Sequence, residues 1–217
     1  MTRLAFVPSP FVGAVSCRPT ADVLPDAIVA DYGGVSAPAW YEGVARRVVA
    51  ACDGRPWIAV LHSGAGGFAP AIASAAENLA GFIFVDAVLP YSGKSCLENA
   101  PADLAEQLRR LTIKGYLAPW NEWFEADPTS KLIADSVARD SFVRDLPRVP
   151  FAFLEEIARA DPGWERLPSA YVQLSRIYRD AADQAERMGW IVRRAKLHHL
   201  AMFTDPVKVA DLLIGLP

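Results

Sequence analysis

The stretch Val60-Leu61-His62-Ser63-Gly64-Ala65-Gly66-Gly67 decides the fold, because it joins an apolar run at 57–61 to an alanine-rich segment at 66–79. The run predicts a buried strand and the segment predicts a helix. A serine on such a strand-to-helix turn has a strained backbone, and its oxygen points toward solvent. The backbone N–H that follows points at whatever the serine attacks. This stretch therefore predicts a nucleophilic serine at Ser63.

The turn matches the pattern G-x-S-x-G only in part, since Leu61 stands where the first glycine is expected. We expect the small residues at 65–67 to leave room for the leucine side chain. Two other interpretations are a plain tight turn and a phosphate-binding loop. The sequence has no lysine in the P-loop position and no G-x-G-x-x-G, so a nucleotide site is disfavoured.

Strands and helices alternate on both sides of this turn. Continuous apolar runs predict strands at 4–7, 26–31, 57–61, 82–85, 170–174 and 190–195, with helix-length segments between most of them. Strands that are apolar throughout are typical of a parallel sheet with helices on both faces. The predicted fold class is α/β, with about six mainly parallel strands flanked by helices.

Residues 89–166 depart from this alternation. The segment is mostly helical in pattern, is interrupted by prolines and is rich in aromatic side chains. We predict a core domain formed by 1–88 and 167–217, with 89–166 inserted after the fourth predicted strand as a helical lid. A small helical unit needs most of these aromatics for its own core. A strip facing Ser63 would nevertheless line an apolar pocket, and Trp120 and Trp123 are the candidates.

A histidine pair follows the last predicted strand, in His198-His199-Leu200-Ala201-Met202. A serine hydroxyl needs a base to accept its proton, and histidine has a suitable pKa. Ligand sites of open α/β sheets lie at the carboxyl edge of the sheet, where this pair and Ser63 are both expected. Each histidine alone is more often structural, but together with Ser63 the pair predicts a catalytic base.

This order of strands, loops and helices resembles the α/β-hydrolase fold over nearly the whole chain. The resemblance implies a triad in the order serine, acid, histidine, and its histidine loop favours His199 over His198. Residues 7–13 resemble the family's oxyanion loop. Pro10 in that loop has no N–H to donate, so the second donor beside the Gly64 N–H would come from Phe11 or Val12. Phe11 is favoured, and Ser9 could add a hydroxyl.

The position of the acid departs from the usual family pattern. The stretch at 169–176, where the resemblance places it, contains no carboxylate. Asp180 and Asp183 come later and suit the first turn of a helix. Asp86 ends the strand at 82–85, a point where some members of the fold carry their acid, although an aspartate there is also a common local cap. We predict that Asp86 is the acid, with an oxygen within roughly 3.2 Å of a His199 nitrogen.

Composition narrows the class of protein. The chain has 217 residues, of which 52% are hydrophobic, and a formal net charge of −3. It has no basic excess for nucleic acid and no run of ~18 apolar residues for a membrane span. The opening residues do not resemble a signal peptide, so a cytoplasmic location is expected. Three cysteines are too few for a metal cluster, and no metal or cofactor is expected. The expected partner is a small apolar substrate, and a homodimer stays open.

The predicted activity is hydrolysis of an ester or thioester that bears an apolar acyl or alcohol group. Ser63 would be the nucleophile, His199 the base and Asp86 the orienting acid. Two alternatives remain, because a fold does not fix a function. One is a non-hydrolytic lyase, cyclase or epimerase that uses the same site in a biosynthetic pathway. The other is a binding protein with a vestigial site.

Overall fold

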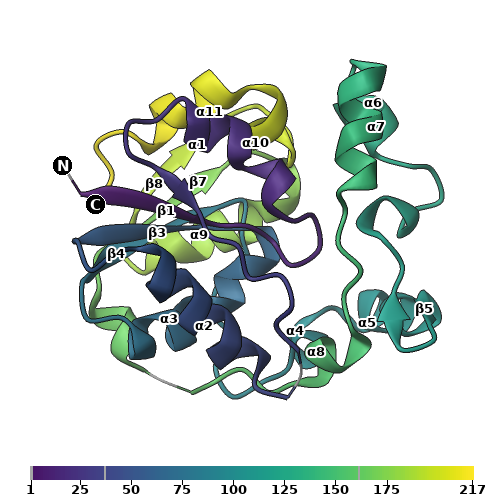
Figure 1. Ribbon diagram of the computed structural model, residues 1–217, viewed down its shortest axis with the longest axis horizontal. Helices are drawn as coiled ribbons and strands as arrows, with labels where there is room; N and C mark the ends of the chain where they lie inside the picture. Colours follow the sequence, from purple (N-terminus) through teal and green to yellow (C-terminus); the bar gives the residue numbers. More distant parts are fainter. Residues whose placement is uncertain (1, 37, 161) are drawn as a thin grey trace.

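A six-stranded parallel sheet forms the centre of the computed structural model, which describes residues 2–36, 38–160 and 162–217 (Figure 1). The strand order is β2-β1-β3-β4-β7-β8, and each neighbouring pair is parallel. The strands are β1 (Arg3–Val7), β2 (Ile28–Val29), β3 (Trp57–His62), β4 (Leu79–Val85), β7 (Ser169–Gln173) and β8 (Ile191–Arg194). The predicted fold class is therefore confirmed.

Helices cover both faces of the sheet, as parallel strands require. One face packs against α2 (Trp40–Ala51), α3 (Ala69–Ala75) and α9 (Arg179–Arg187). The other face packs against α1 (Arg18–Asp22), α10 (Ala201–Thr204) and α11 (Pro206–Leu213), which lie together at the top of Figure 1. Two separate apolar clusters result, one on each face.

The central strand β3 shows why continuous apolar runs form this sheet. All six of its residues are buried, and alternate side chains enter opposite clusters. Ala59 and Leu61 pack toward α2 and α3, whereas Ile58 and Val60 pack toward the other face. Each large aliphatic side chain buried in this way contributes about 1.5–3 kcal/mol relative to exposure. Burial on both faces fixes the strand and, with it, the turn that carries Ser63.

Between β4 and β7 the chain leaves the sheet and forms a mainly helical insert, at the right of Figure 1. Its elements are α4 (Cys96–Asn99), α5 (Ala102–Arg110), the hairpin β5 (Thr112–Ile113) and β6 (Tyr116–Leu117), α6 (Thr129–Leu132), α7 (Ser136–Arg144) and α8 (Phe151–Glu155). Short 3-10 turns complete the chain at Ala14–Ser16, Ser63–Phe68, Trp120–Glu122, Pro162–Arg166 and Arg176–Tyr178.

Several details differ from the sequence expectations. The hairpin was not predicted, and its turn at Lys114 and Gly115 has positive φ at both residues, as tight hairpins require. The strand expected at 26–31 is only Ile28–Val29, because it lies at the edge of the sheet and pairs with β1 alone. Among the described residues, no helix is long and apolar enough to cross a bilayer.

Candidate active site

Ser63 lies at the sharp turn between β3 and the 3-10 turn Ser63–Phe68, with φ of +55°. A positive φ is uncommon for a residue with a side chain, and it costs energy that the surrounding structure must supply. One constraint comes from Val88, whose N–H donates to the Ser63 carbonyl oxygen at 3.0 Å. The backbone is therefore strained where the sequence predicted it.

The closest approach of another backbone segment to this turn is at Gly66, and position 61 is filled by a buried leucine. A Cβ on Gly66 would lie 1.8 Å from the carbonyl oxygen of Val88, so no larger residue fits there. Leu61 is fully buried in the cluster beside α2 and α3, and Ala65 occupies the second glycine position of the pattern. The turn thus forms although both glycines of G-x-S-x-G are replaced.

A chain of hydrogen bonds joins Ser63, His199 and Asp86. The Ser63 Oγ lies 3.1 Å from Nε2 of His199, and Nδ1 of His199 lies 3.1 Å from Oδ2 of Asp86. Their exposed fractions are 7%, 9% and 0%, so Asp86 is fully buried while Ser63 and His199 keep a small exposed surface. Because the carboxylate can only accept, Nδ1 carries the proton and Nε2 is free to accept from the serine hydroxyl. The Asp86–His199 distance meets the limit set from the sequence.

Asp86 is held by the very loop that lacks a carboxylate. Its Oδ1 accepts hydrogen bonds from the N–H groups of Leu174 at 2.7 Å and Ser175 at 3.0 Å, just after β7. Burial acts to raise the pKa of Asp86, but the bonds from His199 and Ser175 outweigh it, so the pKa lies below its ordinary value. Asp86 also has a positive φ of +42°, which turns its side chain off the end of β4.

The two histidines at 198 and 199 make different contacts. His199 contacts Ser63 and Asp86, whereas Nε2 of His198 lies 3.1 Å from the hydroxyl of Thr204 in α10. Asp180 is exposed, and Asp183 pairs with Arg194 at 2.8 Å. The structure thus brings His199 and Asp86 together with Ser63, and it leaves His198, Asp180 and Asp183 outside this series.

His62 is a second buried histidine beside the first. Its ring stacks on that of His199 with centroids 4.8 Å apart, and its Nε2 lies 3.2 Å from the carbonyl oxygen of His199. Burial and the nearby His199 lower the pKa of His62 to about 3, so it is neutral at ordinary pH. A neutral ring with its proton on Nε2 can donate to that carbonyl, which helps fix the backbone of His199.

The predicted oxyanion loop packs against the turn. A Cβ on Gly64 would lie 2.8 Å from the ring of Phe11, so loop and turn touch at this glycine. The Gly64 N–H is one of the first N–H groups of its 3-10 turn. These groups have no hydrogen-bond acceptor within the turn. The Phe11 N–H donates a long bond of 3.3 Å to the hydroxyl of buried Ser9. The three candidate residues thus lie together, with the Phe11 donor already engaged by Ser9.

A largely apolar cavity of about 410 Å³ opens in front of Ser63 and His199. Its aromatic lining comes from the loop after β1 and from the insert: Phe11, Trp120, Trp123, Phe124 and Phe153. Both predicted tryptophans therefore face the cavity, and the Trp123 ring meets that of Phe11 edge to face at 5.0 Å. Trp164 instead packs under the sheet against Phe84 and Trp190.

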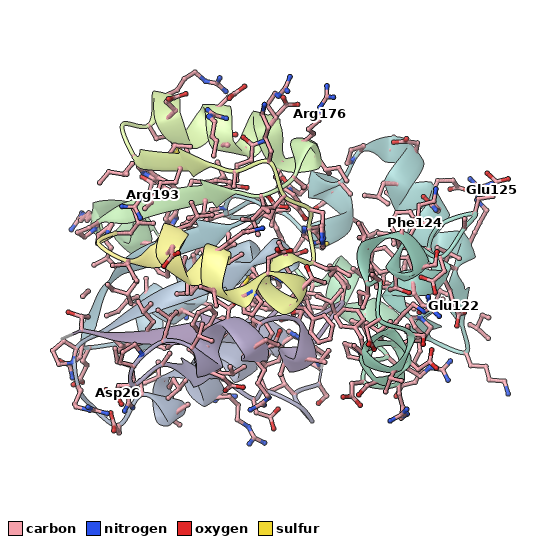
Figure 2. All side chains as sticks on the ribbon, turned by 90° about the horizontal axis from the view of Figure 1, so that it is seen from above. Asp26, Glu122, Phe124, Glu125, Arg176 and Arg193 are labelled. Carbon is pink, nitrogen blue, oxygen red and sulfur yellow. The ribbon has the colours of Figure 1, made fainter. Side chains whose placement is uncertain are left out.

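The mouth of the cavity lies between the core and the insert. Ile177 from the core and Phe124 from the insert both line the cavity, yet they are 84% and 47% exposed. Figure 2 shows Phe124 on the insert and Arg176, the neighbour of Ile177, on the margin of the core. These exposed lining residues lie where the core meets the insert, and Tyr178 directly follows Ile177.

Tyr178 is a site residue that sequence reasoning missed. Its hydroxyl lies 3.3 Å from the Ser63 Oγ, and its ring stacks on His199 at 5.1 Å with an angle of 14°. Burial raises the pKa of Tyr178 to about 12, so the hydroxyl keeps its proton at ordinary pH. Ser63 and Tyr178 are far apart in the chain, and no local pattern marks the tyrosine.

The three cysteines form no disulfide bond. Cys17, Cys52 and Cys96 are free thiols, of which Cys96 lines the cavity and Cys17 lies in the cluster beside α1. Over the described ranges, no group of three or more histidine, cysteine or acidic side chains is arranged to hold a metal ion.

No protein-family model matches the chain, and no curated protein matches its sequence. Solved structures do match its fold along nearly all of its length. An extracellular α/β-hydrolase from a Paenibacillus species, described as sharing structural and functional homology with tobacco salicylic acid binding protein 2, is 18% identical with a TM-score of 0.78. The match covers 100% of this chain and 99% of that one.

Two further structures are similar in the same way. Polyneuridine aldehyde esterase, solved as a variant, is 13% identical with a TM-score of 0.67, and the match covers 98% of each chain. A variant of tomato methylketone synthase I, solved with β-ketoheptanoate, is 10% identical with a TM-score of 0.66, over 98% of this chain and 96% of that one. The chain therefore has the α/β-hydrolase fold.

Proposed function

We propose that this protein is a serine hydrolase that cleaves carboxylic esters or thioesters bearing an apolar group. The observation that carries the proposal is the hydrogen-bonded series Ser63–His199–Asp86 on a strained turn at the floor of an apolar cavity. A serine held this way can be activated by the histidine while the acid fixes the histidine tautomer. That two of the similar structures are described as a hydrolase and an esterase adds support.

In the first half of the reaction the Ser63 oxygen attacks the carbonyl carbon of the substrate. The hydroxyl proton passes to Nε2 of His199, and the electron pair of the carbonyl moves onto its oxygen. The Gly64 N–H donates to that oxygen, and the Phe11 N–H joins it when its long bond to Ser9 is exchanged. Collapse of the intermediate expels the alcohol or thiol, which takes the proton from His199.

The second half of the reaction repeats these steps with water. His199 accepts a proton from water, which attacks the acyl group bound to Ser63. The carboxylic acid leaves, and Ser63 recovers its proton from His199. Asp86 stabilises the imidazolium of His199 in both halves and remains ionised, which its lowered pKa favours.

The cavity supports a substrate with an apolar part of modest size. A volume of about 410 Å³ falls at the small end of the ~300–1,000 Å³ of typical small-molecule sites. Aromatic side chains of the insert, including Trp120 and Trp123, form one wall, so residues 89–166 would act as a lid that excludes water from the reacting atoms. The free thiols are consistent with a cytoplasmic location, which we keep as part of the proposal.

A non-hydrolytic reaction is the second candidate, and two observations favour it. The Phe11 N–H is occupied by Ser9, which leaves the Gly64 N–H as the donor that is ready for an oxyanion. One similar structure is a methylketone synthase. An acid–base reaction at an apolar ketone or hydroxy compound could use Ser63 and His199 without an acyl-enzyme.

Turnover of nitrophenyl esters and acyl thioesters of increasing chain length tests the proposal. We expect hydrolysis of a medium-length ester, and Ser63→Ala should lower kcat by at least ~10³-fold without loss of folding. Asp180→Asn is the matched control and should keep its activity, since Asp180 is exposed. Wild-type turnover in Ser63→Ala would exclude the triad. Carbon–carbon or carbon–oxygen bond cleavage without uptake of water would favour the second candidate.

A further inference from the structure

We infer that Tyr178 is a fourth catalytic residue, whose phenolic O–H donates first to the Ser63 Oγ and then to a substrate oxygen. The inference rests on the proposed function and deepens it. It begins from geometry: the Tyr178 hydroxyl lies 3.3 Å from the Ser63 Oγ. The ring stacks on His199 with centroids 5.1 Å apart, which fixes the position of the phenolic oxygen beside Ser63.

The direction of this hydrogen bond follows from the rest of the site. Asp86 is an acceptor, which places the proton of the imidazole on Nδ1 of His199. Nε2 must then accept, and its hydrogen-bond partner among the described residues is the Ser63 hydroxyl. With its own proton committed to His199, the Ser63 Oγ can only accept from Tyr178. Tyr178 is therefore the donor.

The same position is useful after the serine has reacted. Once the Ser63 Oγ is bonded to the substrate carbon, the other oxygens on that carbon are separated from it by two bonds. A donor that reaches the Ser63 Oγ can turn to one of them with a small rotation. Tyr178 keeps its proton throughout, because burial raises its pKa to about 12, and no proton needs to be transferred. It would serve as a preorganised donor in a site where the Phe11 N–H is engaged by Ser9.

The ring of Tyr178 has a second, separable effect. When His199 accepts the serine proton it becomes a cation, and an aromatic face stacked on it stabilises that charge. Tyr178→Phe removes the hydroxyl but keeps this ring, so it isolates the hydrogen bond. Tyr41→Phe is the matched control, since its hydroxyl is also buried and lies 3.0 Å from that of Tyr91, and Tyr41 is not among the residues that line the cavity.

The experiment measures kcat and KM of wild type, Tyr178→Phe and Tyr41→Phe with the best nitrophenyl ester. It also measures the rate at which a fluorophosphonate labels Ser63. For Tyr178→Phe we expect kcat to fall by about 10²- to 10³-fold with KM little changed, and labelling to slow by a similar factor. Tyr41→Phe should match wild type in both. Thermal unfolding should show that each variant is folded.

The outcomes separate this inference from the function beneath it. If wild type hydrolyses the ester and Ser63 is labelled, but Tyr178→Phe has the wild-type kcat and labelling rate, the inference about Tyr178 is wrong and the proposed function stands. An increase in KM alone would also overturn it, because the hydroxyl would then act in binding and not on the reacting oxygen. If wild type neither hydrolyses esters nor is labelled, both proposals fail.

Discussion

Replacing Asp86 by Asn is the most informative single substitution, because the structure fixes what the new amide must do. Oδ1 of Asp86 accepts from two backbone N–H groups, those of Leu174 and Ser175. In Asp86→Asn the amide oxygen has to keep these two bonds, since an NH₂ group there would face two donors. The NH₂ group is then turned toward Nδ1 of His199 in place of a carboxylate oxygen.

This orientation reverses the tautomer of His199. Nδ1 now accepts from the asparagine, so the imidazole proton moves to Nε2, where it faces the Ser63 hydroxyl. The histidine can no longer accept the serine proton. In serine proteases the same substitution costs about 10⁴-fold in kcat, equivalent to ~5.5 kcal/mol in the barrier. We expect a loss of this order in kcat/KM for the best nitrophenyl ester at pH 7.

Stability should change far less than activity. Both backbone hydrogen bonds survive, and they change from charge-assisted to neutral, a loss of about 1–2 kcal/mol. For a chain of this size that lowers Tm by roughly 2–8 °C, measured by circular dichroism. Asp183→Asn is the control: it breaks a partly exposed ion pair with Arg194 and should keep activity within about twofold. If Asp86→Asn retained a tenth of the wild-type kcat/KM, the reasoning on the tautomer would be refuted.

Three further predictions concern the turn and the cavity. His62→Gln should make the free energy of unfolding less sensitive to acid, because below about pH 6.5 the unfolded chain binds a proton at His62 and the folded protein does not. In urea unfolding between about pH 6 and 4, wild type should therefore lose ~1.4 kcal/mol per pH unit more than the variant. Parallel curves of stability against pH would contradict this. In urea unfolding, Gly66→Ala should cost more than ~3 kcal/mol or prevent folding, because its Cβ meets a backbone oxygen. Gly33→Ala should cost less than about 1 kcal/mol, because its Cβ would lie 3.2 Å from the exposed Asp31 carboxylate, which can move aside. Trp123→Ala should shift the preferred ester toward bulkier acyl groups, and an unchanged chain-length profile would argue against a lid that lines the pocket.

The sheet could be predicted from the sequence because its strands are apolar throughout, and burial on both faces leaves few other structures for such runs. Local signals were weaker in the insert. The helical pattern of the insert does not show where α6 ends and α7 begins. The chain extends at Ile133, and α7 starts where the Asp135 side chain accepts from the N–H of Ala138. An aspartate followed by serine is a common helix start, so this signal was present in the sequence.

The residues of the site also differ in how far the sequence predicts their positions. Ser63, His199 and Asp86 each follow a predicted strand, so the parallel sheet brings them to one edge, and their contacts follow from the topology. Tyr178 belongs to a 3-10 turn that no periodicity marks, and its place beside Ser63 depends on how that turn packs. The hydrogen bond from the Phe11 N–H to the Ser9 hydroxyl depends on the conformation of residues 7–13, and no sequence pattern indicates it.

The central claim is that the Ser63 oxygen is a nucleophile, and covalent trapping tests it most directly. The protein is treated with a fluorophosphonate, and the adduct is located by mass spectrometry of the peptides. We expect one adduct per chain, on Ser63, that is absent in Ser63→Ala and forms far more slowly in His199→Ala. Ester hydrolysis by a wild-type protein whose Ser63 stays unmodified, or whose adduct lies on another residue, would contradict it.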